Sequence, residues 1–360
     1  MSTWEQIEQT VKEAVDRGDF PSAAIGIGDR ERTYVCAAFG NTSITEDKRP
    51  VSIRTLYDVA SLTKIMATSM VAFRMIEEGK LRLNDRISEF LLAPMDKQDV
   101  TVLQVMTHTA GFSADFRLEE MIQEPEAAAR CILRRPLFCP PGKRVVYSCM
   151  GYILLGRMLE EIGGRGLDEL AREMVFEPLG MESAGFRPFT DVSAALDEGM
   201  RQDIAWTEWD EELGWYWTGV VHDENARFLR GVSGNAGVFC SLEDMMKFGR
   251  MLVRDGDGFL SSAMLRTAIR NYTPQLGEHR GLGFQIKDDF SFFGDLMGPR
   301  SYGHNGFTGT SLAVDPDTGL YVALLTNRVH PKRQNDTIFR FRHIIHNMAA
   351  AAYTGRERTG

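Results

Sequence analysis

The strongest constraint on the fold of this 360-residue chain is that its strand-like runs lie near its two ends, far apart in the sequence. Between them, residues 85–230 show the periodicity of helices, interrupted by proline and glycine. This order indicates one sheet built from both ends of the chain, with a helical lobe inserted into it. The strand-like runs are 23–28, 33–39, 282–287, 310–315 and 320–326.

A turn sequence predicts the direction of the C-terminal strands. Residues 316–319, Pro-Asp-Thr-Gly, separate two of the runs and are typical of a hairpin turn, which makes that part of the sheet antiparallel. We predict an α/β fold of the α+β type, with an antiparallel sheet flanked by helices and a mostly helical lobe. The sheet domain is expected to comprise 1–60 and 235–360, the lobe 61–234, and the active cleft to lie between them. Helices are expected up to Asp19 and over 62–78, 242–253 and 336–352.

Composition argues against several classes of partner. The chain has 50 acidic and 41 basic residues, and the net charge of -9 disfavours nucleic acid. No apolar run approaches the roughly 20 residues of a membrane helix, and the first twenty residues lack the pattern of a secretory signal. Five scattered cysteines fit a reducing compartment, so we expect a cytoplasmic protein without a membrane partner, metal or cofactor.

The first candidate for chemistry is Ser61-Leu62-Thr63-Lys64, an S-x-x-K sequence at the expected start of a helix. Residues three apart on a helix are neighbours, so the Lys64 amine can reach the Ser61 hydroxyl. Free N–H groups at a helix start favour a developing oxyanion, and apolar surroundings would lower the pKa of Lys64 and let it act as a base. Taken alone, the four residues are better explained as a capping serine followed by a surface lysine.

Two further motifs favour a catalytic role for Ser61 and Lys64. Tyr147 follows a Pro-Pro-Gly turn and precedes a glycine-containing helix, and residues 302–309 read Tyr-Gly-His-Asn-Gly-Phe-Thr-Gly before a strand. Together with Ser61 and Lys64, these motifs resemble the serine β-lactamase and penicillin-binding protein superfamily. The closest resemblance is to its class C-like branch of esterases, D-aminopeptidases and DD-peptidases, and it extends from Phe20 nearly to the end of the chain.

The resemblance implies a β-lactamase/transpeptidase-like fold and a role for each motif. Ser61 and Lys64 match the first motif, Tyr147 the second, and His304, Asn305 and Gly306 the third. By this resemblance, Ser61 is the nucleophile, Tyr147 exchanges a proton with Ser61 or the leaving group, and Lys64 keeps both polarised. The backbone N–H groups of Ser61 and Phe307 would form the oxyanion hole.

Two positions depart from the pattern of the superfamily. Cys149 stands where the second motif usually has Asn or Asp, and a thiol is only a weak hydrogen-bonding group. This puts β-lactam hydrolysis in doubt and leaves Cys149 as an altered substrate-binding residue beside His304, Asn305 and Gly306. His304 replaces the lysine of many β-lactamases, so we expect the charge of the third motif to depend on pH near neutrality.

Four tryptophans lie in one short acidic stretch, 206–217. Such a stretch is expected either to line the pocket and stack on part of the substrate or to pack against the helical lobe. The tryptophans are Trp206, Trp209, Trp215 and Trp217.

These observations predict a serine hydrolase that forms an acyl-enzyme with a small ester, amide or peptide substrate. The expected substrate is a carboxylic ester or a D-amino-acid-containing amide or peptide resembling a cell-wall fragment, with weak β-lactam hydrolysis as a side reaction. The alternative is a non-catalytic, penicillin-binding-protein-like sensor that binds peptides or muropeptides. The motifs leave the oligomeric state open.

Overall fold

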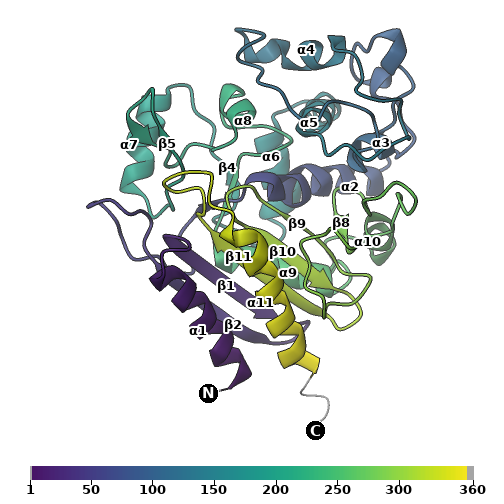
Figure 1. Ribbon diagram of the computed structural model, residues 1–360. Helices are drawn as coiled ribbons and strands as arrows, with labels where there is room; N and C mark the ends of the chain where they lie inside the picture. The colour runs from purple at the N-terminus through teal and green to yellow at the C-terminus, as the bar shows by residue number, and fades with distance from the viewer. Residues whose placement is uncertain (1, 355–360) are drawn as a thin grey trace.

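The computed structural model describes residues 2–354, and its central feature is a six-stranded antiparallel sheet (Figure 1). The strand order is β2-β1-β11-β10-β9-β8, so strands from both ends of the chain lie side by side. The predicted fold class is therefore confirmed. The strands are β1 (Ser22–Gly28), β2 (Thr33–Gly40), β8 (Gln285–Ile286), β9 (Tyr302–Asn305), β10 (Ser311–Asp315) and β11 (Leu320–Thr326).

Two neighbouring inner strands, β1 and β11, come from opposite ends of the sequence. Every residue of β1 and β11 is buried, and they pair antiparallel with Ala23 opposite Thr326. Strands covered on both faces read as continuous apolar runs, which is the pattern of 320–326. The predicted hairpin between β10 and β11 is also present, with Asp315 opposite Leu320.

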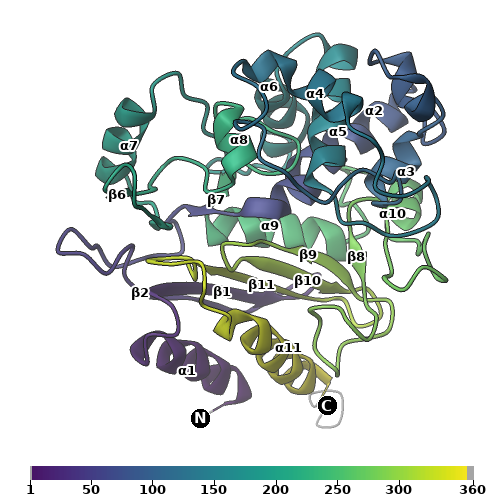
Figure 2. The same cartoon turned by 45° about the horizontal axis from the view of Figure 1, so that its top comes forward.

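Helices cover both faces of the sheet. Helix α1 (Thr3–Asp16) and helix α11 (Thr337–Thr354) lie on one face, and helix α9 (Leu242–Val253) lies on the other, between the sheet and the helical lobe (Figure 2). The buried side of α1 presents Ile7 and Val11 to the sheet, and their spacing of four residues is that of one face of an amphipathic helix. Ser2 caps α1 by accepting a hydrogen bond from the Glu5 N–H.

The helical lobe consists of short helices around α5. The short strands on this side of the molecule form a three-stranded sheet, β3-β7-β4, and a two-stranded sheet, β5-β6. The sequence did not predict them, because strands of two or three residues are too short to show alternation. The helices are α2 (Ser69–Glu77), α3 (Val102–Met106), α4 (Ala128–Arg134), α5 (Cys149–Gly163), α6 (Leu167–Ala171), α7 (Val192–Arg201), α8 (Glu224–Phe228) and α10 (Ser262–Ala268). The short strands are β3 (Tyr57–Asp58), β4 (Gly185–Phe186), β5 (Trp209–Asp210), β6 (Trp215–Tyr216) and β7 (Val238–Cys240).

The sequence predicts that Ser61 stands at the start of a regular helix. The structure differs from this prediction. A 3₁₀ turn covers Ala60–Leu62, a π-helical turn covers Lys64–Thr68, and α2 begins only at Ser69. Turns of this wide type are frequent at functional sites.

Within residues 2–354, no helix is both long and apolar enough to cross a membrane. The domain division at 60/61 and 234/235 stays a prediction.

Candidate active site

Ser61 lies in a strained turn that Asp58 holds in place. Ala60, the residue before it, has a φ of 48°, which is unusual for a residue with a side chain. The buried Asp58 carboxylate accepts hydrogen bonds from the Ala60 N–H (2.8 Å) and the His222 N–H (2.7 Å). Strain of this kind persists only where surrounding contacts fix the backbone, and it is concentrated at functional sites. Asp58 therefore positions the Ser61 turn.

Lys64 lies completely buried beneath Ser61. Its ammonium donates hydrogen bonds to the Ser61 Oγ at 3.1 Å and to the Asn235 backbone carbonyl at 2.9 Å. The Cys149 Sγ lies 3.7 Å from the same nitrogen. The S-x-x-K sequence thus brings its two functional groups together, and Lys64 is not a surface lysine.

The ionisation of Lys64 differs from the expectation. Burial lowers the pKa of Lys64, but its coupling to the Cys149 thiol and to the Tyr147 phenol, which also hydrogen-bonds to it, leaves the pKa raised. Burial also raises the pKa of the Cys149 thiol, to about 11, so the thiol is neutral near pH 7. The prediction of a lysine with a lowered pKa, ready to act as a base, is wrong. Lys64 carries a positive charge in the resting protein.

Tyr147 precedes α5 and faces the same centre. Its ring centroid lies 5.0 Å from the Lys64 Nζ and 4.6 Å from the His108 ring. Burial raises the pKa of Tyr147, and the positive Lys64 only partly opposes this, so the phenol is protonated near neutral pH. Its buried hydroxyl lies within reach of Lys64 and Ser61, and hydrogen bonding to these two side chains lowers the pKa of Tyr147 against the effect of burial.

His304, on strand β9, forms part of the wall of the site around Ser61. Its Nδ1 lies 2.7 Å from the Asn305 carbonyl, so this nitrogen carries the proton and donates, which leaves Nε2 as an acceptor. Burial, together with the charges of Lys64 and Arg280, lowers the pKa of His304 to about 3. The expectation of a charge that depends on pH near neutrality is therefore wrong, and His304 is a neutral hydrogen-bonding group.

The loop after β9 is tied directly to the Ser61 turn. Thr308 donates a hydrogen bond to the Asp58 carbonyl and Thr310 one to the Val59 carbonyl. Gly306 allows this close approach, because a Cβ at that position would lie 2.5 Å from the Val59 oxygen. These contacts fix the Gly306-Phe307 peptide against the turn.

The two expected oxyanion donors are unused. In the described part of the chain, neither the Ser61 N–H nor the Phe307 N–H donates a hydrogen bond to another segment. The Phe307 carbonyl accepts a hydrogen bond from the buried Arg328 at 2.8 Å, which fixes the orientation of the residue. The geometry suits two backbone donors that converge on a carbonyl oxygen.

Arg342 holds this loop from the sheet side. It is buried within α11, and its Nη2 donates to the carbonyls of Gly306 (3.0 Å) and Thr310 (2.9 Å). A guanidinium that donates hydrogen bonds to two carbonyls of one loop fixes the loop conformation. We expect Arg342 to position the Phe307 N–H indirectly, through the loop, without contacting the substrate.

Replacing Arg342 with Met is expected to lower kcat about 10- to 100-fold with KM nearly unchanged, because a slight displacement of an oxyanion donor affects the transition state most. Arg342→Lys should recover part of the rate. The matched control is Arg340→Met, on the exposed side of the same helix. The role is contradicted if kcat falls only in proportion to the fraction of unfolded protein, measured by thermal unfolding.

These residues surround a cavity of about 430 Å³. It brings together all the predicted site residues except Lys64, which lies beneath its floor. The lining residues are Ala60, Ser61, Asp115, Tyr147, Cys149, His222, Asp223, Glu224, Ala236, Arg280, Gln285, His304, Asn305, Gly306, Phe307, Arg328, Arg333 and Phe339.

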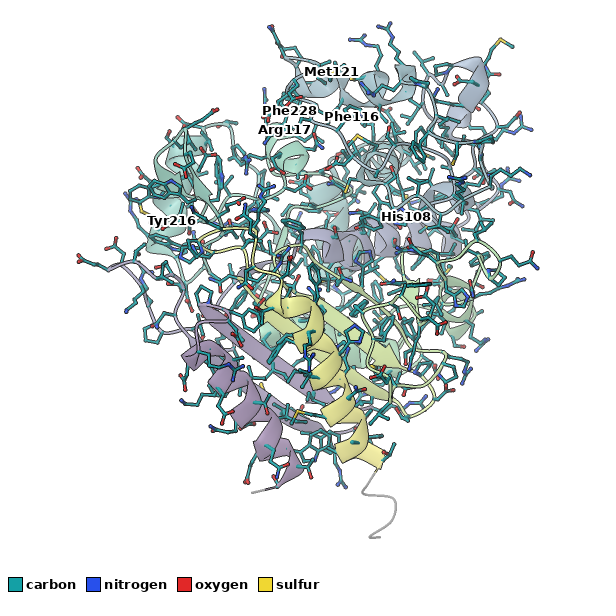
Figure 3. The ribbon with its side chains drawn as sticks, viewed as in Figure 1. His108, Phe116, Arg117, Met121, Tyr216 and Phe228 are labelled. Carbon is teal, nitrogen blue, oxygen red and sulfur yellow. The ribbon has the colours of Figure 1, made fainter. Side chains whose placement is uncertain are left out.

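None of the four clustered tryptophans lines this cavity. The β5–β6 hairpin that carries two of them packs its aromatic rings on one another and on His330; for example, the Tyr216 ring lies 4.6 Å from the His330 ring. Figure 3 shows Tyr216 at the side of the molecule, well away from His108, which packs on Tyr147. Of the two expectations for this stretch, lining the pocket is therefore wrong.

Several residues of the site could not be selected from the sequence. Asp58 is not part of any of the three motifs, and Asn235 contributes a backbone carbonyl, which any residue provides. Three charged residues on the cavity wall could not be selected from the sequence either, because no spacing links them to Ser61. They are Asp115, Asp223 and Arg280.

Comparison with known proteins agrees with the geometry. The chain is 28% identical over 360 residues to a protein of Escherichia coli K12 named "Putative D-alanyl-D-alanine carboxypeptidase", covering 90% of this chain and 82% of the relative. Two solved structures share the fold: EstCE1, a hydrolase with promiscuous acyltransferase activity (TM-score 0.77, 21% identity, 97% and 98% coverage), and the octameric penicillin-binding protein homologue of Pyrococcus abyssi (0.74, 22%, 95% and 77%). A profile of the Beta-lactamase family matches residues 7–345, which confirms the resemblance. The chain therefore belongs to the beta-lactamase family and is a hydrolase of that family.

Proposed function

We propose that the protein hydrolyses a carboxylic ester or a D-amino-acid-containing amide or peptide through an acyl-enzyme on Ser61. The observation that carries this proposal is the 3.1 Å hydrogen bond from the buried Lys64 ammonium to the Ser61 Oγ, at the floor of a cavity of about 430 Å³. A serine held by a buried cation in an open cavity has the geometry of an activated nucleophile.

The ionisation states favour a relay through Tyr147. As the Ser61 oxygen bonds to the substrate carbonyl carbon, its proton passes to the Tyr147 oxygen, and the phenol proton passes to the leaving oxygen or nitrogen. This transfer needs no group with a lowered pKa, because Tyr147 accepts one proton while it gives another. The Lys64 charge stabilises the negative charge that develops on both oxygens. Water then attacks the acyl-enzyme by the reverse relay.

The oxyanion of the tetrahedral intermediate would be bound by the N–H groups of Ser61 and Phe307. Removing one such donor typically costs about 10²- to 10³-fold in rate. The threonine and Arg342 contacts described above support this role, because they hold the Phe307 backbone against the Ser61 turn. Asn305 and Gly306 would contact the substrate along β9 and the loop that follows it.

Arg280 favours a substrate with a carboxylate. Its guanidinium lies 5.4 Å from the Tyr147 ring centroid and lines the cavity, and its Nη2 is paired with Glu278 at 2.6 Å. A leaving group protonated by Tyr147 would depart next to this cation. A C-terminal amino acid fits this position better than a neutral alcohol, and the name of the Escherichia coli relative agrees with a carboxypeptidase reaction.

Cys149 argues for weak activity on β-lactams. Its thiol lies beside Lys64, where related enzymes have an amide or a carboxylate, and it offers only a weak hydrogen bond. We place the reaction in the cytoplasm, because all five cysteines are free thiols, as expected in a reducing compartment.

The test is intact-mass spectrometry after exposure to a fluorophosphonate and, separately, to a penicillin, comparing the wild type with Ser61→Ala. We expect a stoichiometric fluorophosphonate adduct on the wild type and none on the variant, since only Ser61 combines a hydroxyl with Lys64 and the oxyanion donors. Penicillin should label slowly or to a small extent.

Other results have distinct meanings. Rapid penicillin labelling followed by release would indicate a β-lactamase and overturn the inference from Cys149. The absence of either adduct on folded protein would contradict the acyl-enzyme and support the alternative, a non-catalytic binder of peptides or muropeptides.

A further inference from the structure

The two halves of the expected oxyanion hole come from different segments of the chain. Ser61 lies in the 3₁₀ turn after β3, and Phe307 lies in the loop between β9 and β10. Both N–H groups can bind one oxygen only if the spacing of the two segments is fixed, because a hydrogen bond weakens steeply when its donor is misaligned. Gly306 precedes Phe307 and has no side chain that would restrict its backbone. The position of the Phe307 ring therefore helps to decide where the Phe307 N–H points.

His222 contacts both halves. Its backbone N–H donates a hydrogen bond of 2.7 Å to the Asp58 Oδ2, and the Oδ1 of the same carboxylate accepts one from the Ala60 N–H, next to Ser61. The imidazole of His222 stacks on the Phe307 ring, with 5.8 Å between the centroids and 21° between the planes. His222 is 3% exposed and lines the cavity. One buried residue thus connects the Ser61 turn to the Phe307 side chain.

Glu208 fixes the ring of His222. The Glu208 Oε2 lies 3.0 Å from the His222 Nε2, and the carboxylate also accepts hydrogen bonds of 2.9 and 2.6 Å from the Arg333 Nε. Burial raises the pKa of Glu208, but the hydrogen bonds from His222 and Arg333 outweigh it and lower this pKa to about 2. The carboxylate is therefore ionised near neutral pH, and the His222 Nε2 carries a proton and donates. Rotation of the His222 ring would break this charge-assisted hydrogen bond.

Two arginines complete the contacts of Phe307. The Arg333 guanidinium, already bonded to Glu208, lies 5.8 Å from the Phe307 ring centroid. The Arg328 guanidinium lies 4.6 Å from the same centroid and donates a hydrogen bond to the Phe307 carbonyl. Glu208, His222, Phe307 and Arg333 therefore form a closed cycle in which each side chain contacts the next. Because Phe307 is 47% exposed, burial of apolar surface does not explain why polar side chains hold its ring in this way.

The acidic stretch 206–217 holds His222 from a second side as well. Arg227 donates a hydrogen bond of 3.0 Å to the His222 carbonyl, and its guanidinium lies 3.8 Å from the ring centroid of the buried Trp217. The Trp217 N–H donates in turn to the Glu208 carbonyl at 3.0 Å. Glu208 comes just before β5, the hairpin strand labelled in Figure 1. This stretch thus fixes both the ring and the backbone of His222.

We propose that His222 is a positioning residue that holds the N–H groups of Ser61 and Phe307 at the spacing of one oxyanion, and that Glu208 fixes its ring for this task. The inference rests on the proposed function, because it takes Ser61 as the acylated residue. His222 exchanges no proton with the substrate and acts through Asp58 and Phe307. The stretch 206–217 then supports the active site from outside the cavity.

The experiment uses three single variants of the contacts. His222→Ala removes the ring but keeps the backbone N–H, His222→Phe keeps a ring beside Phe307 without the bond to Glu208, and Glu208→Gln removes the charge. Each is also combined with Phe307→Ala. Glu211→Gln, an exposed acid of the same hairpin, is the control for Glu208→Gln. His330→Ala is the control for His222→Ala, because His330 is also buried and packs on the hairpin outside the cavity.

Two readouts separate positioning from a general loss of structure. The first is kcat and KM for p-nitrophenyl acetate. The second is the inhibition constant of phenylboronic acid, whose boron bonds to the oxygen of a nucleophilic serine as the hydroxyl proton leaves. The product is a tetrahedral anion with one oxygen placed like an oxyanion, so a misplaced donor should weaken its binding along with kcat.

We expect His222→Ala to lower kcat about 10- to 100-fold with KM nearly unchanged, and to weaken phenylboronic acid by a similar factor. Glu208→Gln should lower kcat about 3- to 10-fold, and His222→Phe should recover most of the rate lost in His222→Ala, because it keeps the ring contact. Both controls should retain the wild-type kcat. In the Phe307→Ala background, His222→Ala should cost less than about threefold, since residues that act through each other are not additive.

A kcat of His222→Ala close to that of the wild type would overturn the inference, as would losses that multiply fully in the double variant or an equal loss in His330→Ala. If thermal unfolding shows that His222→Ala does not fold, Glu208→Gln with and without Phe307→Ala decides in the same way. In all these cases, wild-type turnover and the fluorophosphonate adduct would leave the proposed function intact. Absence of both signals in the wild type would instead remove the hydrolase itself, and the positioning role with it.

Discussion

Replacing Lys64 with Met is expected to lower kcat/KM about 10³-fold or more while the protein remains folded. The ammonium is the group that bonds to the Ser61 Oγ and lies beside Tyr147, so its removal takes away both the orientation of the nucleophile and the charge that stabilises the relay. Positioned proton-transfer groups typically contribute about 10²- to 10⁴-fold. The measurement is steady-state hydrolysis of p-nitrophenyl acetate together with the rate of fluorophosphonate labelling.

The free energy of unfolding of Lys64→Met should be equal to or higher than that of the wild type. Lys64 is fully buried, and a buried charge is costly unless well paired, whereas methionine fills a similar volume. The loss of the hydrogen bond to Asn235 opposes this gain by about 1 kcal/mol. Lys97→Met is the matched control, because Lys97 is also buried but lies outside the cavity. A rate loss in Lys64→Met that merely follows unfolding would contradict the catalytic role.

Acidification from pH 6.5 to 5 is expected to destabilise the protein by several kcal/mol. Four histidines have a pKa lowered in the folded state, chiefly by burial, to about 3 for His304 and His346, to about 4 for His330 and well below normal for His108. The unfolded chain takes up these protons near pH 6.5 and the folded chain does not. Stability is therefore present above pH 6.5 and falls as the pH decreases, by up to about 1.4 kcal/mol per histidine and pH unit.

One acid reduces this effect without reversing it. The raised pKa of Asp115, about 6, lets the folded protein take up one proton in the same range. Urea unfolding between pH 5 and 7 measures the net slope. His346→Leu should reduce the slope by about one proton, because the ring of His346 is fully buried and this burial keeps it neutral in the folded protein. A flat stability profile over this range, or an unchanged slope in the variant, would contradict the prediction.

The sequence by itself determined features that depend on local pattern. The apolar runs at both ends predicted a sheet shared by the two termini, and the turn at 316–319 gave the antiparallel β10–β11 pair. The S-x-x-K spacing predicted that Lys64 reaches Ser61, because three residues of helical chain span that distance in any fold. Motif order also selected Tyr147 and His304, which the structure brings to the same cavity. Their chemical roles remain a prediction.

Only the tertiary structure decided the electrostatic properties of the site. Coupling to Cys149 and Tyr147 raises the pKa of Lys64 against the effect of burial. Burial and the charges of Lys64 and Arg280 lower the pKa of His304. The strand of His304 was missed, since four residues with a glycine show no clear alternation. Asp115, Asp223 and Arg280 meet around Ser61 only after the lobe and the sheet pack together. Their positions depend on long-range contacts, and such contacts leave no periodicity or spacing in the sequence.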